Sequence, residues 1–264
     1  MAIAATRGCR PPVRLWTPGP TVARRCDAPP VPVLPVPAAA VLAALALGVA
    51  GLATPRVVAA LPRAGDLAVG DSGPDYRALG AVPDLRIVTT AVGVSLGALL
   101  GWRLGLATVL PWLHLVGVGL ALSWVDVREH RLPDALVLPS LVVAPVLVAA
   151  VSLARGQPGS LVRAVMGMAA SWLVFRLLRA VAPAGLGRGD VKLAAWTGLL
   201  TAWLSWPTLV VGFVAAVGIG GVAAVVVLLR GGSRRTAVPF GPMLLGGAVL
   251  AAVSAPLTDW YLST

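Results

Sequence analysis

Residues 104–134 read LGLATVLPWLHLVGVGLALSWVDVREHRLPD, an apolar run that stops abruptly at a cluster of charges. The run from 104 to 125 is long enough to cross the hydrocarbon core of a bilayer as a helix, which takes about 20 residues. The charged cluster begins at Asp126 and ends at Asp134. This stretch therefore predicts a membrane-spanning helix with an acidic residue at its end.

The rest of the chain repeats this alternation of apolar runs and short polar turns. Of its 264 residues, 58% are hydrophobic and 12% are charged, and the mean hydropathy of +0.90 excludes an ordinary soluble domain. We predict an all-α, multi-pass transmembrane helical bundle of about seven or eight spans. The apolar runs lie at about 38–53, 87–101, 104–125, 135–154, 161–181, 193–204, 207–230 and 239–260.

Composition divides the chain into three parts. Residues 1–32 are rich in Arg and Pro, cannot bury a core, and are predicted to be a disordered tail. Residues 33–86 hold the first apolar segment and a polar loop. Residues 87–264 are predicted to form the membrane-embedded domain that carries the activity.

Three glycines recur at every fourth position in the second apolar run. Gly93, Gly97 and Gly101 share one face of the expected helix. In lipid, small residues at this spacing let two helices approach closely. We therefore predict that this face packs against another helix.

The formal net charge of +11 would suit a nucleic-acid-binding protein. The basic residues, however, lie in the tail or flank the apolar runs, where they fix orientation in the membrane. Alternation places the loops around 126–134, 185–192 and 230–236 on one side, with seven Lys or Arg, and the intervening turns on the other, with two. We therefore expect these loops to face the cytoplasm from the plasma (inner) membrane, and no nucleic-acid partner.

The first apolar run conflicts with this topology. If residues 38–53 span the membrane, the Arg-rich N-terminus lies outside, against the positive-inside rule. Either this run is re-entrant or wrongly placed, or the true start codon lies downstream.

Acidic residues are scarce in the membrane region. Between residues 104 and 257 they are Asp126, Glu129, Asp134 and Asp190. Asp126 directly follows one apolar run and Asp190 closely precedes another, so both are expected near the same membrane boundary. They have two interpretations: helix caps or partners of nearby Arg and Lys side chains, or members of one functional site.

Two aspartates that share one site would form a catalytic pair. Like-charge repulsion raises one macroscopic pKa, so one carboxylate accepts a proton from water while its protonated partner donates to a carbonyl. This is peptide hydrolysis without a metal or a covalent intermediate. The chain has two histidines and two cysteines, and both cysteines, Cys9 and Cys26, lie in the tail. We therefore expect no metal and no cofactor.

Three blocks of sequence, in order, resemble the type IV prepilin peptidases, a family of membrane-embedded aspartic proteases. The first is SWVDVREHRLPD at 123–134. The second, GRGDVKL at 187–193, is similar to the family's GxGD signature, and the third, AVPFGP at 237–242, looks like its PFGP segment. Together they cover roughly residues 87–264.

The resemblance implies that Asp126 and Asp190 are the catalytic pair. The family cleaves the short basic leader of prepilins or pseudopilins on the cytoplasmic side, after a Gly that precedes a hydrophobic helix. Type IV or Flp-like pilin helices and the lipid bilayer are therefore the expected partners. Gly187 and Gly189 would let the backbone turn tightly and admit substrate, while Lys192 would steady a carboxylate or a phosphate headgroup, or serve only as an interfacial anchor.

The other motif residues have plainer interpretations. Pro133 and Asp134 are interpreted as turn-formers, and Glu129 and His130 as solvated loop residues. Two prolines at the start of the last apolar run favour the beginning of a helix. The resemblance suggests that the same segment forms a wall of the substrate groove, made by Pro239, Phe240, Gly241 and Pro242.

Larger members of this family carry a zinc-binding tetracysteine domain and also methylate the new N-terminus. Residues 55–86 contain neither Cys nor His, so the chain is similar to a compact form, and N-methyltransferase activity is not expected. Two alternatives stand beside the peptidase. One is an ion or proton transporter, which predicts acids midway along spans, and the other is an inactive membrane scaffold of the same fold.

Overall fold

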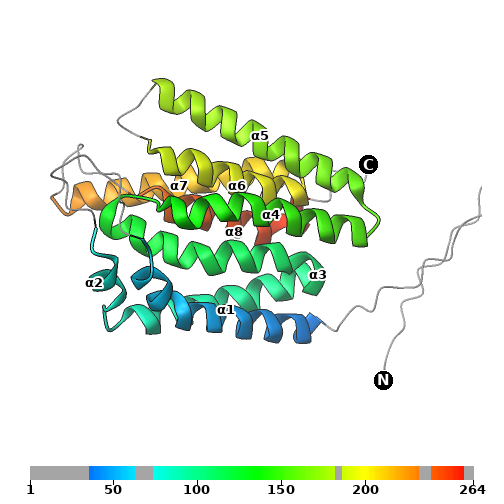
Figure 1. Cartoon of the computed structure of the whole chain (residues 1–264). Coiled ribbons are helices and arrows are strands. Elements are labelled where there is room, and N and C mark those ends of the chain that lie inside the picture. Colours follow the sequence, from blue (N-terminus) through cyan, green and yellow to red (C-terminus); the bar gives the residue numbers. More distant parts are fainter. Residues whose placement is uncertain (1–35, 63–73, 182–185, 232–238, 259–264) are drawn as a thin grey trace, which may run out of the picture. The chain divides into compact units, whose positions relative to one another are not determined.

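The computed structural model describes residues 36–62, 74–181, 186–231 and 239–258. The predicted tail at 1–32, with both cysteines, lies outside this part of the chain. All regular elements in the described residues are helices, which confirms the predicted all-α class (Figure 1). They are α1 (Val36–Ala59), α2 (Tyr76–Gly80), α3 (Leu85–Glu129), α4 (Asp134–Ala154), α5 (Pro158–Val181), α6 (Arg188–Leu204), α7 (Trp206–Leu229) and α8 (Gly241–Thr258).

Five of the described helices, α1, α3, α4, α5 and α7, are long and apolar enough to cross a membrane. The chain is therefore a multi-pass membrane protein. This is a count of helices and not of crossings, because α3 joins two of the expected runs, one on each side of Gly105, in 45 residues. In addition, α6 has only 17 residues and the apolar part of α8 is short.

Helix α3 is bent back on itself at Gly105. This residue has φ 70° and ψ 168°, a conformation that glycine adopts without the strain a Cβ would cause. The first arm (85–104) and the second arm (106–129) run in opposite directions (Figure 1). Accordingly, the indole N–H of Trp124, late in the second arm, donates to the carbonyl of Leu79, which precedes the first arm, at 3.2 Å.

The glycine face of the first arm packs directly against α1, which confirms that prediction. At each of Gly93, Gly97 and Gly101 an added Cβ would collide with a backbone carbonyl of α1. The Thr89 hydroxyl continues the line by donating to the carbonyl of Gly51 at 2.8 Å. The carbonyls that face the three glycines belong to Leu47, Ala43 and Ala39, in that order.

We expect Gly97→Leu to lower the midpoint of thermal unfolding in detergent. A leucine side chain has no space where the α1 backbone lies, and overpacking of this kind costs about 1–3 kcal/mol. The matched control is Gly221→Leu on α7, because a Cβ at Gly221 meets no atom within 4 Å. Equal unfolding midpoints for the two variants would contradict the close contact between α1 and α3.

The loop expected between 55 and 86 is partly helical. The Asp75 carboxylate caps α2 by accepting from the N–H groups of Arg77 and Ala78 at 3.1 and 3.3 Å. Tyr76 is 6% exposed and packs in a cluster with Val58 of α1 and Val125 of α3. A short polar segment thus acquires structure because its one large side chain is buried beside the end of α3.

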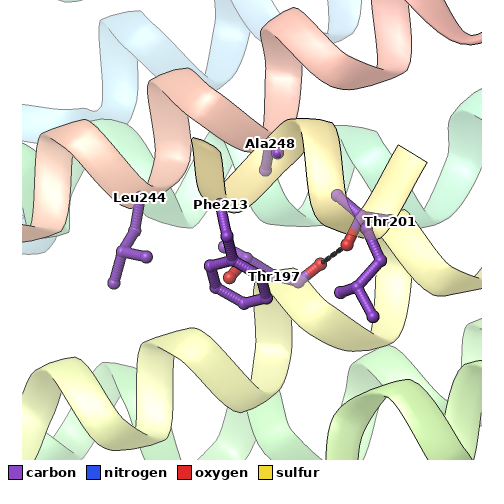
Figure 2. A pocket seen from close by; sticks show the side chains of 7 residues that line it. Thr197, Thr201, Phe213, Leu244 and Ala248 are labelled. Carbon is purple, nitrogen blue, oxygen red and sulfur yellow. Dashed lines mark hydrogen bonds between the residues drawn. The ribbon is translucent and has the colours of Figure 1, made fainter. Parts of the chain in front are cut away.

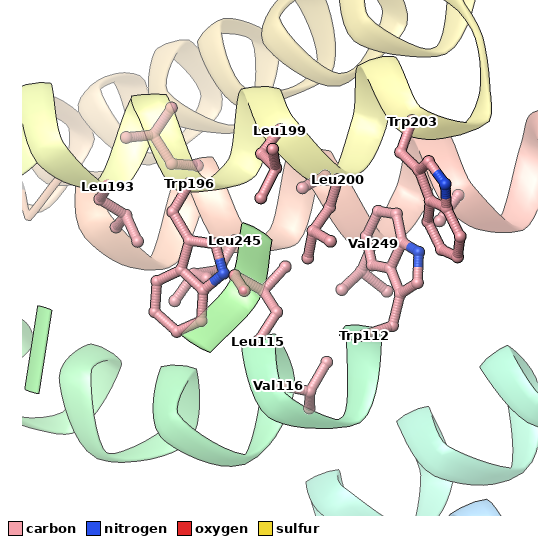
Figure 3. Packing of buried hydrophobic residues seen from close by; sticks show 14 of the residues in the cluster. Trp112, Leu115, Val116, Leu193, Trp196, Leu199, Leu200, Trp203, Leu245 and Val249 are labelled. Carbon is pink, nitrogen blue, oxygen red and sulfur yellow. The ribbon is translucent and has the colours of Figure 1, made fainter. Parts of the chain in front are cut away.

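The main core lies around α6, whose residues from 193 to 203 are all buried (Figure 3). The fully buried Trp112 of the second arm and Trp196 of α6 are its largest side chains. The Trp203 indole N–H donates to the Ser152 hydroxyl oxygen at 2.9 Å and so links α6 to α4. The short helix α6 is therefore held on several sides by neighbouring helices.

Candidate active site

Three helix ends meet at the two aspartates. Asp126 lies in the last turn of α3 and is 4% exposed, and Asp190 lies in the first turn of α6 and is 9% exposed. The start of α8 joins them, because the N–H of Gly241 donates to Oδ2 of Asp126 at 2.8 Å. Both acids are thus buried at helix ends, where the sequence placed them.

A backbone N–H group holds each carboxylate. For Asp190 the donor is the N–H of Gly187, at 2.9 Å from Oδ2. This contact is half of a capping box, in which the acid at the third helical position bonds back to the residue before the helix. Asp190 therefore does cap the start of α6, as one of the two interpretations of the sequence expected. Since both donors lie at helix N-termini, their partial positive charge also favours the ionised carboxylates.

Asp190 lies in α6, outside the five candidate membrane spans. Burial raises the pKa of its carboxyl to about 6, the N–H of Gly187 acts against this rise, and the negative charge of Asp126 adds to it. The charge of Asp126 therefore contributes to the raised pKa of Asp190. Near neutral pH, Asp190 is protonated in a larger fraction of molecules than an ordinary aspartate.

Leu132 packs between the two aspartate-bearing helix ends. A Cβ added at Gly189 would lie 2.6 Å from Cβ of Leu132, and one added at Gly241 would lie 3.3 Å from its Cδ2. Leu132 thus contacts both the neighbour of Asp190 and the residue that bonds Asp126. Nothing in the sequence marks Leu132 as a site residue, because one leucine in a loop carries no chemical signal.

We expect Gly189→Ala to lower the rate of any reaction that needs both carboxyls. The new methyl group would displace Leu132 at its Cβ, which cannot rotate away, and so shift one aspartate relative to the other. A misplacement of about 1 Å costs on the order of a hundredfold in rate. Steady-state kinetics checks this, with Gly159→Ala as control because a Cβ there meets nothing within 4 Å. An unchanged kcat in Gly189→Ala would contradict the conclusion that the packing of Leu132 fixes the positions of the two aspartates.

The segment 239–242 contributes to the site directly. The Phe240 ring lies 6.2 Å from that of Phe175 on α5, which lies 5.2 Å from that of Phe213 on α7. These contacts anchor the start of α8. Next to this anchor, a Cβ at Gly241 would lie 2.8 Å from Oδ2 of Asp126, so a side chain there would disturb the carboxylate.

Lys192 lies near the site but bonds a different acid. Its Nζ donates to Oδ1 of Asp134 at 2.6 Å, and the two side chains are 28% and 59% exposed. Asp134 is the first residue of α4 and directly follows Pro133. The ion pair therefore connects the start of α4 to the start of α6. Exposed pairs of this kind contribute about 0–1 kcal/mol, which makes Lys192 a local brace at most.

Glu129 and His130, which were interpreted as solvated loop residues, lie at the end of α3. Glu129 is its last residue and is half-buried, and His130 is exposed with the left-handed φ of 51°. The N–H of His130 donates to the carbonyl of Asp126 at 2.8 Å. The chain therefore turns sharply just after the first aspartate.

An apolar groove of about 720 Å³ lies along α3 and α8. Both arms of α3, Ile219 of α7 and the length of α8 line it. At the end next to the aspartate its walls include Trp124, Val127 and Pro242. Val127 directly follows Asp126, and Pro242 directly follows the glycine whose N–H bonds Asp126, so this end of the groove lies near that aspartate.

A second cavity, between α6, α7 and α8, is a packing feature (Figure 2). It leaves no room for a water molecule. The Thr201 hydroxyl that lines it donates to the carbonyl of Thr197 at 2.8 Å, so its polar group is satisfied within α6. Across the four described ranges, no three His, Cys, Asp or Glu side chains gather in a way that would hold a metal ion.

Comparison with known proteins relates this site to one family. Residues 113–225 match the model of the type IV leader peptidase family. The prepilin leader peptidase/N-methyltransferase of Pseudomonas putida is 36% identical over 164 residues, which cover 61% of this chain and 56% of the relative. The protein of the same name from Aeromonas salmonicida is 30% identical over 189 residues, 69% of this chain and 61% of the relative.

The chain thus spans little more than half the length of these relatives. No solved structure matches it. The matched segment includes the end of α3 and the start of α6, and with them Asp126 and Asp190. Residues 113–225, which include both acids, are therefore similar to the type IV leader peptidase family.

Proposed function

We propose that this chain is a membrane-embedded aspartic endopeptidase that removes the basic leader from type IV or Flp-like prepilins or pseudopilins. In this proposal Asp126 and Asp190 are the catalytic pair. The observation that carries it is the burial of two carboxyls where three helix ends meet. The names of the relatives supply the substrate class.

The proposed chemistry needs one ionised and one protonated carboxyl. The ionised carboxylate takes a proton from a water molecule, whose oxygen attacks the carbonyl carbon of the scissile peptide. The protonated carboxyl donates its proton to the carbonyl oxygen. When the tetrahedral intermediate collapses, the C–N bond breaks and the carboxyl that took the proton from water gives it to the leaving nitrogen. A hydroxyl of the intermediate returns its proton to the other carboxylate, which restores the starting pair. The N–H groups of Gly241 and Gly187 orient the two carboxyls without placing a fixed positive charge in the site.

We place the site at the cytoplasmic face of the plasma (inner) membrane. Arg128, Arg131, Arg188 and Lys192 lie close to the two aspartates in the sequence, and basic residues of this kind favour the cytoplasmic side. The basic leader would remain in the cytoplasm while the apolar helix of the precursor lies in the bilayer. A transporter is less well supported, because both acids lie within one turn of a helix end rather than midway along a span.

The test uses a precursor from the same genome with a short basic leader, a Gly and then an apolar stretch of about 20 residues. This test precursor is co-expressed with the wild-type chain and with the double variant Asp126→Asn/Asp190→Asn. We expect a shorter product on a gel with the wild type alone, and mass spectrometry should place its new N-terminus directly after the Gly. Uncut precursor in the presence of folded wild-type protein would overturn the proposal.

A further inference from the structure

The apolar groove runs along the first arm of α3 and along α8. The lining of the first arm of α3 runs from Val88 to Leu99, and that of α8 from Pro242 to Val253. Each of these walls spans 11 helical steps, roughly 17 Å at 1.5 Å per residue. That is about half the thickness of the hydrocarbon core and about three turns of a helix.

The end of the groove at the active site is firmly built. Trp124 forms part of the wall there, and its indole N–H donates to the carbonyl of Leu79 at 3.2 Å. On the ring's face, the Arg128 guanidinium lies 4.5 Å from the ring centre. Pro242 of the opposite wall directly follows Gly241, whose N–H bonds Asp126. This end of the groove is therefore built by residues adjacent in the chain to Asp126 and to Gly241.

The chemistry of the walls selects an apolar occupant. Most lining side chains are Val, Leu or Ile. The Thr89 hydroxyl, one of the few polar groups there, already donates to the carbonyls of Gly51 and Leu85. The groove thus offers apolar packing along its length.

We propose that this groove holds the apolar helix of the precursor, and that the first arm of α3 is the wall that selects which helix fits. The proposal rests on the proposed peptidase function, which requires a peptide to reach Asp126 and Asp190 from within the bilayer. A lipid chain would fill apolar space but would have no reason to end at a carboxyl pair.

The selecting wall lies outside the segment that matches the family. That segment begins at residue 113, whereas the first-arm lining lies at 88–99. The glycine face of the same arm fixes it against α1, so its position does not depend on the occupant. Specificity for the apolar helix would thus be set by a part of the chain separate from the carboxyls.

The chain offers a matched pair of leucines for the test. Leu99 lines the groove and is 42% exposed, while Leu110 is 46% exposed and lies outside the lining. We expect Leu99→Trp to raise KM for the test precursor about tenfold and to leave kcat unchanged, because the indole blocks docking and not chemistry. Leu110→Trp should leave both constants unchanged.

Photocrosslinking reports occupancy independently of cleavage. With p-benzoylphenylalanine at position 99, we expect an adduct with the test precursor, and with the same group at position 110 we expect none. Equal adducts at the two positions, adducts with lipid alone or with a second copy of the chain, or an unchanged KM in Leu99→Trp would each overturn the groove assignment. Crosslinking at 99 without cleavage by the wild type would instead overturn the peptidase function and leave the docking site standing.

Discussion

Asp126→Asn and Asp190→Asn are each expected to lower kcat for the test precursor by about a thousandfold or more. Removing a general acid or base costs about 10²–10⁴ in rate, and each substitution also removes the partner that perturbs the other carboxyl. An amide cannot take the proton from water, nor does it donate a carboxyl proton to the peptide. The measurement is single-turnover cleavage in detergent micelles, followed by gel densitometry.

The asparagine variants separate chemistry from folding. The side-chain oxygen of Asn can still accept from Gly241 or Gly187, so the contacts between helix ends should survive. Their unfolding midpoints should therefore stay close to that of the wild type. The matched control is Glu129→Gln, an acid one turn after Asp126 that should retain activity within a fewfold. Retained cleavage by either Asp variant would remove that residue from the catalytic pair.

Arg163→Met is expected to be the most destabilising substitution on α5, lowering the free energy of unfolding by about 3 kcal/mol. The guanidinium donates to the carbonyls of Ala202, Trp203 and Leu204 at 2.7, 2.7 and 2.9 Å. These carbonyls form the C-terminal end of α6, where a cation is favoured and where the helix itself provides no N–H donors. Without the guanidinium of Arg163, these three carbonyls would lose its N–H donors at the end of α6.

Thermal unfolding in detergent checks this expectation. Arg176→Met is the control, since Arg176 is an exposed residue on the same helix. Arg163→Lys should fall between the wild type and Arg163→Met, because an ammonium group cannot reproduce the planar fork of a guanidinium. An Arg163→Met midpoint equal to that of Arg176→Met would contradict the capping role. Because α6 carries Asp190, we also expect Arg163→Met to lose activity at lower temperature than the control.

Several features could be predicted from the sequence because each depends on local pattern. Apolar runs define helices in a membrane, and an acid directly next to such a run must lie at a helix end. This placed Asp126 and Asp190 where they are found. The glycine spacing of 93, 97 and 101 likewise predicted a helix contact, because only the identity of one helical face was needed.

The short helices were harder to predict. The sequence gives α2 no apolar repeat, and it forms because Tyr76 is buried against α1 and α3. Helix α6 falls short of a typical span, and its stability comes from burial among its neighbours and from Arg163 on another helix. In both cases the stabilising contact comes from residues distant in the chain.

The sequence by itself determined the helical class, the membrane setting, the helix ends that carry the acids and the family resemblance. The fold of the whole chain was needed to show that α3 doubles back at Gly105, that Leu132 and Gly241 pack at the site, and that an apolar groove runs along α3 and α8. The physical reason is the range of the interactions. Hydropathy and small-residue spacing act within one helix, whereas a backbone N–H donated across 115 residues depends on how all the helices pack.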